Sequence, residues 1–177
     1  MPSTNDDHFV HDRRDRALEV IDLYDDALPQ VFGYLVGRSH DRQLAEELTA
    51  ETFLAALGQA RRDAVDDVTI AWLIGIARHK LADHWRRLAR REECDMGDDV
   101  NALPADDPWD AVLDEHRVAG VLDSLGPHHR VALTLRYLDG LSVPEVAGLL
   151  QRTVHATEAL LVRARSAFRL AYEGSAR

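Results

Sequence analysis

The sequence is poor in cysteine and has no long apolar run. Its single cysteine, Cys94, has no partner within the chain, which excludes an intramolecular disulfide and a cysteine-rich metal site. Charged residues interrupt the apolar stretches well before they could span a bilayer, and the N-terminal stretch MPSTNDDHFVHDRRD contains no apolar segment. We therefore expect no membrane insertion and a cytoplasmic location.

Basic charge is also in short supply. Acidic residues outnumber basic ones by 31 to 21, which gives a formal net charge of −10. This balance argues against one large basic face, but it does not exclude nucleic-acid binding, because the positions of the charges matter more than their sum. The sequence has no glycine-rich phosphate loop and no nucleophile elbow, so we expect no enzymatic activity, no catalytic residues and no cofactor.

Apolar residues recur at helical spacing along most of the chain, and alternating strand patterns are missing. This predicts an all-α protein. The first pattern has steps of three and four residues and predicts one buried stripe, formed by Val20, Ile21, Tyr24, Leu28, Val31, Phe32 and Leu35. Because Pro29 lies inside this pattern, we expect a kink or a break between two helical pieces.

The next helix, predicted from about residue 41 to 60, has two amphipathic sides. One side suits packing in a helical bundle and contains Ala45, Phe53, Ala56, Leu57 and Ala60. The other side gathers leucines and carboxylates, namely Leu44, Glu47, Leu48, Glu51 and Leu54. This surplus surface indicates either a docking face for a partner or a helix buried on two sides within its own domain.

A third helix, predicted from about residue 68 to 91, begins apolar and ends basic. Its core stripe contains Trp72, Leu73, Ile76, Ala77, Leu81 and Trp85. Cations crowd its later part, namely Arg78, Lys80, Arg86, Arg87, Arg90 and Arg91, together with His79 and His84. Cations near a helix C-terminus complement the helix dipole, so part of the cluster has a structural explanation. The combination of many cations with aromatic groups favours phosphate contact and base stacking.

Composition changes abruptly after the third helix. The segment EECDMGDDVNALPADD, which begins at Glu92, is rich in aspartate and has little apolar periodicity. It is typical of a flexible, solvated spacer. We therefore predict two small helical domains, at residues 15–92 and 109–172, joined by an acidic linker at 93–108.

The C-terminal domain begins with two predicted helices. The first has apolar positions up to Gly126 and contains Trp109, Val112, Leu113, Leu122 and Leu125. The second begins at Pro127 and ends at Asp139-Gly140, with a predicted core stripe of Val131, Leu133, Leu135 and Tyr137.

The last two predicted helices form a helix-turn-helix. Ser142 and Glu145 have the spacing of a capping box, and Thr153 is the best N-cap for the second of these helices. The inner side contains Val146, Ala147, Leu150, Thr157, Leu160, Leu161, Ala164 and Phe168. The outer side begins with Thr153, His155, Glu158 and Ala159, and Val162 and Arg163 follow; in this motif such positions contact base edges. A helical hairpin without a DNA role is the alternative for this stretch alone.

Taken in order, these segments resemble one family, the extracytoplasmic-function (ECF, group 4) sigma factors of the sigma-70 superfamily. AEELTAETFLAAL (45–57) is similar to the family's core-binding signature, and AWLIGIARHKLADHWRR (71–87) to its segment for the minus-ten element. LGPHHRVALTLRYLDGLSVPEVAGLL (125–150) and VRARSAF (162–168) are similar to its region 4. The resemblance covers nearly the whole chain from Leu18 to Phe168. It implies a sigma region 2 bundle at 15–92 and a sigma region 4 domain at 109–172.

The resemblance also implies partners and sites. RNA polymerase core would bind through its β′ clamp helices at Leu44, Glu47, Leu48 and Glu51, and its β flap would contact region 4. The single-stranded minus-ten element would contact Arg61, Arg62, Trp72, His79, Lys80, Asp83, Arg86 and Arg87. The duplex minus-thirty-five element would contact Arg152, Thr153, His155, Glu158, Ala159 and Arg163. An anti-sigma factor is a further implied partner, one that would be able to hold the protein at the membrane.

Three departures from the family pattern stand out. Ala50 replaces the usual glutamine of the core-binding signature, His79 replaces the usual asparagine, and Glu158, together with Leu160, stands where many members have basic residues. We therefore expect an unusual upstream-element preference. A stand-alone helix-turn-helix regulator is the alternative function, although it leaves the second and third helices without a role. A metal site at His79, Asp83 and His84 is not expected, because His84 lies about 140° around the helix from His79 and no other third ligand is evident at helical spacing.

Overall fold

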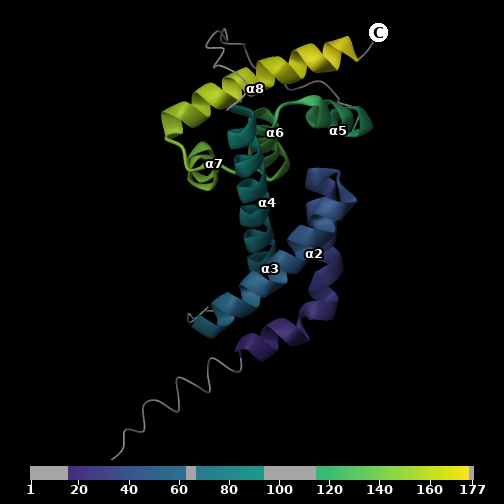
Figure 1. The fold of residues 1–177 in the computed structure, drawn as a ribbon, viewed down its shortest axis with the longest axis vertical. Helices are drawn as coiled ribbons and strands as arrows, with labels where there is room; N and C mark the ends of the chain where they lie inside the picture. The colour runs from purple at the N-terminus through teal and green to yellow at the C-terminus, as the bar shows by residue number, and fades with distance from the viewer. Residues whose placement is uncertain (1–15, 63–66, 94–114, 176–177) are drawn as a thin grey trace, which may run out of the picture. The chain divides into compact units, whose positions relative to one another are not determined.

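The structure is a computed structural model that describes residues 16–62, 67–93 and 115–175 (Figure 1). Every element of regular structure in these ranges is helical, which confirms the predicted all-α fold. Residues 16–22 are helical, and the later elements are α2 (Tyr24–Ser39), α3 (Arg42–Arg62), α4 (Ile70–Glu93), α5 (Glu115–Ser124), α6 (Pro127–Leu133), the π-helix η1 (Thr134–Leu138), α7 (Val143–Leu150) and α8 (Val154–Gly174). Cys94 and nearly all of the predicted acidic linker lie outside the described residues.

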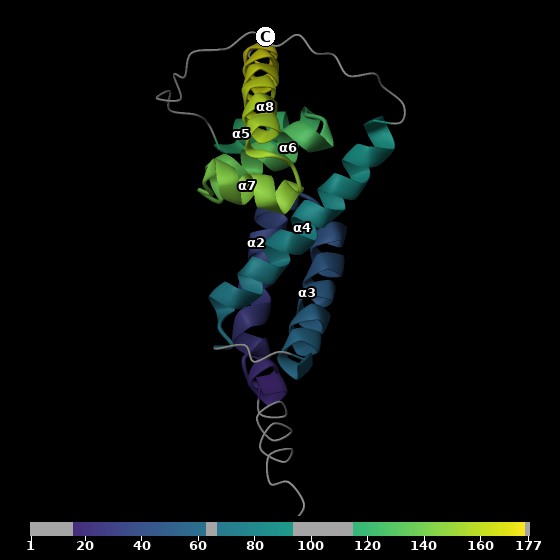
Figure 2. The same cartoon turned by 90° about the vertical axis from the view of Figure 1, so that its left-hand side faces the viewer.

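The chain divides into two compact units, Met1–Leu81 and Ala82–Arg177. In the first unit, α2 and α3 lie side by side (Figure 2). Their contact is apolar: Val31 and Leu35 of α2 are fully buried, as are Ala45 and Ala56 of α3. The ring centroids of Tyr24 and Phe53 lie 4.7 Å apart, which adds an aromatic contact between the two helices.

The prediction for the first stripe was wrong in two respects. The interruption falls at Leu23, between residues 16–22 and α2, whereas Pro29 lies inside α2. Pro29 removes one backbone donor, but the helix continues through it. Val20 is buried, whereas Ile21 lies about 100° around the helix from it and is 58% exposed. Tyr24, which was also predicted in the stripe, is 42% exposed.

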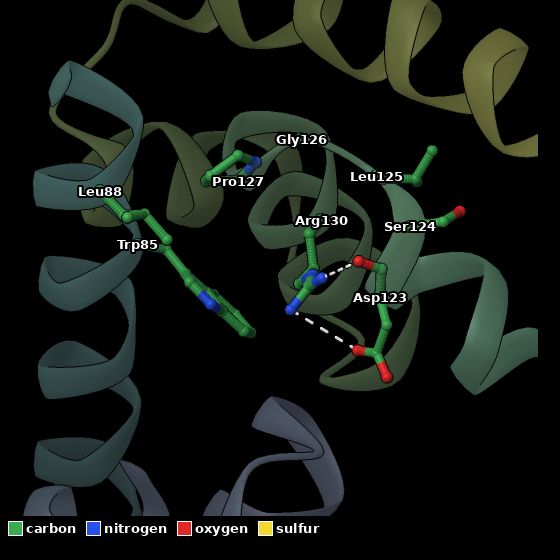
Figure 3. A pocket seen from close by; sticks show the side chains of 8 residues that line it. All are labelled: Trp85, Leu88, Asp123, Ser124, Leu125, Gly126, Pro127 and Arg130. Atoms are coloured by element: carbon green, nitrogen blue, oxygen red, sulfur yellow. Dashed lines mark hydrogen bonds and ion pairs between the residues drawn. The ribbon is translucent and has the colours of Figure 1, made fainter. Parts of the chain in front are cut away.

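In the second unit, α8 lies across α5, α6 and α7 (Figure 1). Its inner side contributes Ala164 and Phe168 to a buried cluster with Val121, Leu122 and Leu133. Arg130 fastens the end of α5 to α6: its Nε donates to the carbonyl of Leu122 at 2.9 Å, and its guanidinium pairs with Asp123 (Figure 3). These contacts hold α5 and α6 together, and α8 packs against both helices.

The π-helix η1 was not predicted from the sequence. Its wider turn is closed by a hydrogen bond from the backbone N–H of Asp139 to the carbonyl of Thr134. A π turn adds one residue to the helical repeat and shifts the residues that follow it. Tyr137, which we placed in the core stripe, is 39% exposed, whereas Val131, Leu133 and Leu135 are buried as predicted.

Candidate polymerase and nucleic-acid interfaces

One side of α3 is exposed, and the opposite side is buried at Ala45, Thr49, Thr52 and Ala56. Glu47 and Ala50 are exposed, Leu44 and Glu51 are half-buried, and Leu54 is 70% exposed. Glu47, Glu51 and Leu54 lie within about 60° of one another around the helix, since each residue turns it by about 100°. We call these three residues the α3 outer face.

Leu48 does not belong to this face, and the prediction that it would be solvent-exposed was wrong. Its exposed fraction is 1%, so it packs in the core of the first unit. The reason is geometric: Leu48 lies about 100° around α3 from Glu47, which turns it toward the buried side occupied by Thr52. The exposed leucine on this side of α3 is Leu54. We placed Leu54 on the side that carries leucines and carboxylates, but not among the predicted polymerase contacts.

The start of α4 is held by Thr69, whose Oγ1 accepts a hydrogen bond from the backbone N–H of Trp72 at 3.2 Å. The predicted core stripe is confirmed at Leu73, Ile76, Ala77, Leu81 and Trp85, all of which are buried. Trp72 itself is half-buried. Burial of this stripe directs the basic residues of α4 to its other sides.

The predicted minus-ten residues are not equally available. Arg61, Arg62, His79 and Arg87 are exposed, and the intervening residues 63–66 lie outside the described residues. Arg86 is less available, because its guanidinium pairs with the carboxylate of Asp83 one turn earlier. Lys80 is engaged across helices, because its Nζ lies 3.2 Å from Oε2 of Glu51 on α3.

The helix-turn-helix begins as predicted. A carboxylate oxygen of Glu145 accepts a hydrogen bond from the backbone N–H of Ser142 at 2.8 Å, which completes the capping box of α7. The turn contains no glycine; Gln151 takes the left-handed conformation instead, with φ 54° and ψ 42°. That conformation is strained for a residue with a side chain, so the tight turn depends on the packing of the two helices around it.

The first turn of α8 presents an exposed polar side. Thr153 caps the helix, and His155, Glu158 and Ala159 are exposed. Leu160 is only 3% exposed, which confirms that it belongs to the inner side. The other predicted inner residues are also buried, namely Val146, Ala147, Leu150, Thr157, Leu161, Ala164 and Phe168.

A cluster of basic side chains lies beside this surface. Nη2 of Arg152 in the turn is 3.5 Å from Nδ1 of His128 on α6. The pKa of the neighbouring His129 is lowered by burial, and the positive charge of Arg163 and the proximity of His128 lower it further. Arg163, on the third turn of α8, is half-buried. The lowered pKa of His129 favours its neutral form.

Neither a membrane helix nor a metal cluster is found in the part of the chain that the structure describes. None of these helices is long and apolar enough to cross a membrane. No three His, Cys, Asp or Glu side chains among the same residues are grouped so that they could hold a metal ion.

Comparison with known proteins identifies two regions of the chain. Residues 23–91 match the family model for Sigma-70 region 2, and residues 116–168 match the model for Sigma-70, region 4. The RNA polymerase sigma factor CarQ of Myxococcus xanthus is 32% identical over 134 residues, which cover 72% of this chain and 74% of CarQ. The chain belongs to the sigma-70 family of RNA polymerase sigma factors. The stand-alone regulator is not favoured, because such a protein does not account for the region 2 match.

Other relatives of this sigma factor carry the ECF name. The ECF RNA polymerase sigma factor BldN of Streptomyces coelicolor is 35% identical over 147 residues, which cover 80% of this chain and 56% of BldN. The chain thus spans little more than half the length of BldN. The ECF sigma factor SigM of Bacillus subtilis is 26% identical, and the match covers 88% of this chain and 96% of SigM.

The fold is shared with a solved sigma factor. The sigma factor RpoE from Bartonella quintana, crystallised in complex with the anti-sigma factor NepR, superposes with a TM-score of 0.54 at 20% identity. The superposition covers 88% of this chain and 97% of that structure.

Proposed function

We propose that this sigma factor binds RNA polymerase core and directs initiation at promoters that contain minus-ten and minus-thirty-five elements. Region 2, at residues 15–92, would bind core and open the minus-ten element. Region 4, at residues 109–172, would bind the minus-thirty-five duplex and the β flap, and residues 93–108 would connect the two. Because polymerase acts on the chromosome, the protein would work in the cytoplasm, where an anti-sigma factor would hold it inactive.

The α3 outer face is proposed to bind the β′ clamp helices. The observation that supports this is the exposure of Leu54 between half-buried and exposed carboxylates, on a helix whose opposite side is fully buried. An exposed leucine flanked by acidic residues is suited to a partner surface that is apolar at its centre and basic at its rim. The proposed contacts with the clamp helices are therefore Leu44, Glu47, Glu51 and Leu54. Leu54 replaces Leu48 in this set, because Leu48 is buried in the core.

The basic part of α4 is proposed to hold single-stranded minus-ten DNA. Arg61, Arg62 and Arg87 are exposed and would contact phosphates, whereas Trp72 and His79 supply flat rings for base stacking. Lys80, Asp83 and Arg86 belong to the same surface, but each is engaged in an ion pair in the free protein.

The start of α8 is proposed to enter the major groove of the minus-thirty-five element. Its N-terminal turn presents Thr153, His155, Glu158 and Ala159, and Arg152 and Arg163 lie on either side of them along the chain. Exposed side chains at this place in a helix-turn-helix contact base edges, and flanking arginines contact phosphates.

The test is run-off transcription with purified core polymerase, together with co-purification of core and mapping of transcript starts. The wild-type protein should yield promoter-specific transcripts only when core is present. Leu54→Asp should lose core binding by at least tenfold with unchanged helicity, whereas Leu170→Asp, at an equally exposed leucine of α8, should leave core binding unchanged. Binding of promoter duplex by the protein alone, without transcripts on addition of core, would refute the proposal.

A further inference from the structure

The ion pair between Glu51 and Lys80 joins two surfaces that have different proposed partners. Glu51 belongs to the α3 outer face, which is proposed to bind polymerase, and Lys80 belongs to the part of α4 proposed to bind single-stranded DNA. Oε2 of Glu51 and Nζ of Lys80 lie 3.2 Å apart, and the two side chains are 36% and 32% exposed, respectively. The pair is therefore neither fully buried nor fully solvated, and either partner can be reached from outside.

We propose that Glu51 masks Lys80 in the free protein and that docking of polymerase on the α3 outer face removes the mask. This inference rests on the proposed function of that face. While the carboxylate of Glu51 holds the ammonium group, a DNA phosphate must displace it to reach Lys80. When polymerase engages Glu51, the ammonium group becomes available to a phosphate, so core binding and DNA binding favour one another.

The size of the effect follows from the exposure of the pair. A half-exposed ion pair is weak, so the mask changes affinity modestly and its effect falls with salt. Coupling between two ligands is reciprocal, so DNA bound at Lys80 also favours polymerase at Glu51. A modest coupling of this kind suffices to bias free sigma factor away from nonspecific single-stranded DNA, whose binding depends on the number of phosphate contacts.

Glu47 offers a matched control for Glu51. It carries the same charge, is exposed, and lies one turn earlier on the same face of α3. Glu47→Gln therefore reports the general effect of removing a negative charge near α4, and Glu51→Gln reports that effect together with loss of the mask. Both substitutions preserve side-chain size, so both variants are expected to fold.

The experiment measures binding of a fluorescent single-stranded oligothymidylate to the free full-length protein over a range of salt concentrations. Glu51→Gln should bind about two- to fivefold more tightly than Glu47→Gln at low salt, and its salt slope should be steeper by about 0.7, as for one added phosphate contact. In a Lys80→Met background, the two glutamate variants should bind equally. If Lys80 is present and the two glutamate variants bind equally, or if Glu51→Gln binds more weakly than Glu47→Gln, the mask is overturned.

Lys80 is the only lysine in the chain, which allows the pair to be observed directly. Reductive ¹³C-methylation keeps the positive charge and labels this side chain and the N-terminal amine alone. The Lys80 methyl resonance should shift in Glu51→Gln but not in Glu47→Gln. A resonance that does not respond to Glu51→Gln would show that no pair forms in solution.

The same oligothymidylate measured with holoenzyme tests the release. Once core is bound, Glu51→Gln and Glu47→Gln should bind the oligothymidylate with equal affinity, because polymerase has already removed the mask in Glu47→Gln. If Glu51→Gln still binds more tightly, release of the mask by polymerase is refuted. Failure of the proposed function gives a different result, since wild-type protein would then not co-purify with core although the two free variants still differed in DNA affinity.

Discussion

The hydroxyl oxygen of Thr153 accepts a hydrogen bond from the backbone N–H of Ala156 at 3.1 Å and so fixes the residue at which α8 begins. Three residues separate the two groups, so the contact is local, yet it sets the position of the proposed base-reading side chains. A shift of one residue would turn that side of the helix by about 100°. The cap thus acts together with the buried inner side of α8 in orienting His155 and Glu158.

Replacing Thr153 by alanine should lower the free energy of unfolding by about 1 kcal/mol, because a first-turn N–H loses its acceptor. Urea unfolding followed by circular dichroism measures the change. Thr153→Ser keeps the hydroxyl and should recover most of the loss. If the serine variant were as unstable as the alanine variant, the methyl group of Thr153 rather than its oxygen would be responsible.

Two leucines of α3 should differ sharply in their effect on stability. Leu48→Ala should lower the free energy of unfolding by about 2–5 kcal/mol, because it leaves a cavity at a fully buried position. Leu54→Ala, at an exposed position of the same helix, should change it by less than about 0.5 kcal/mol. Similar losses for the two variants, measured by urea unfolding, would show that the two sides of α3 have been assigned wrongly.

Stability should depend on pH through His129. Its folded-state pKa lies below the ordinary value of 6.5, so below pH 6.5 the unfolded chain binds more protons than the folded one. The stability of the wild-type protein should therefore fall as pH decreases from 6.5 toward the folded-state pKa. Unfolding free energies measured along this range should fall less in His129→Gln than in the wild-type protein. Arg163→Gln should reduce the fall only in part, because His129 is still buried in that variant.

Glu158 should determine a preference within the minus-thirty-five element. A carboxylate accepts a hydrogen bond from the amino group of cytosine, so Glu158→Ala should reduce discrimination at one base pair by about 1–3 kcal/mol. Run-off transcription from a library of upstream elements measures the change, with His155→Ala as a second variant expected to alter a different position. A uniform gain across all sequences would mean that Glu158 acts through phosphate repulsion instead.

Arg87 should contribute to open-complex formation mainly through charge. Arg87→Ala should weaken open complexes and make the salt slope shallower by about 0.7, the value for one phosphate contact to a single strand. Arg90→Ala, at an exposed arginine one turn later, tests whether the effect is specific to position 87. An unchanged slope in Arg87→Ala would remove Arg87 from the set of phosphate contacts.

The sequence by itself determined where most helices begin and end. Apolar periodicity, the capping box at Ser142 and the N-cap at Thr153 depend on residues within one turn of each other, so they are legible without knowledge of the fold. The inner side of the helix-turn-helix followed from the same local rule, and Leu160 was assigned to it correctly.

Only the tertiary structure decided which of two amphipathic sides faces the core. Leu48 and Leu54 have the same side chain and lie on the same helix, and their burial differs because of where neighbouring elements pack. No residue type marks the π turn that begins at Thr134, so the sequence did not predict it. Glu51 and Lys80 are 29 positions apart and meet because α3 and α4 fold together, a contact between helices that periodicity within one helix does not encode.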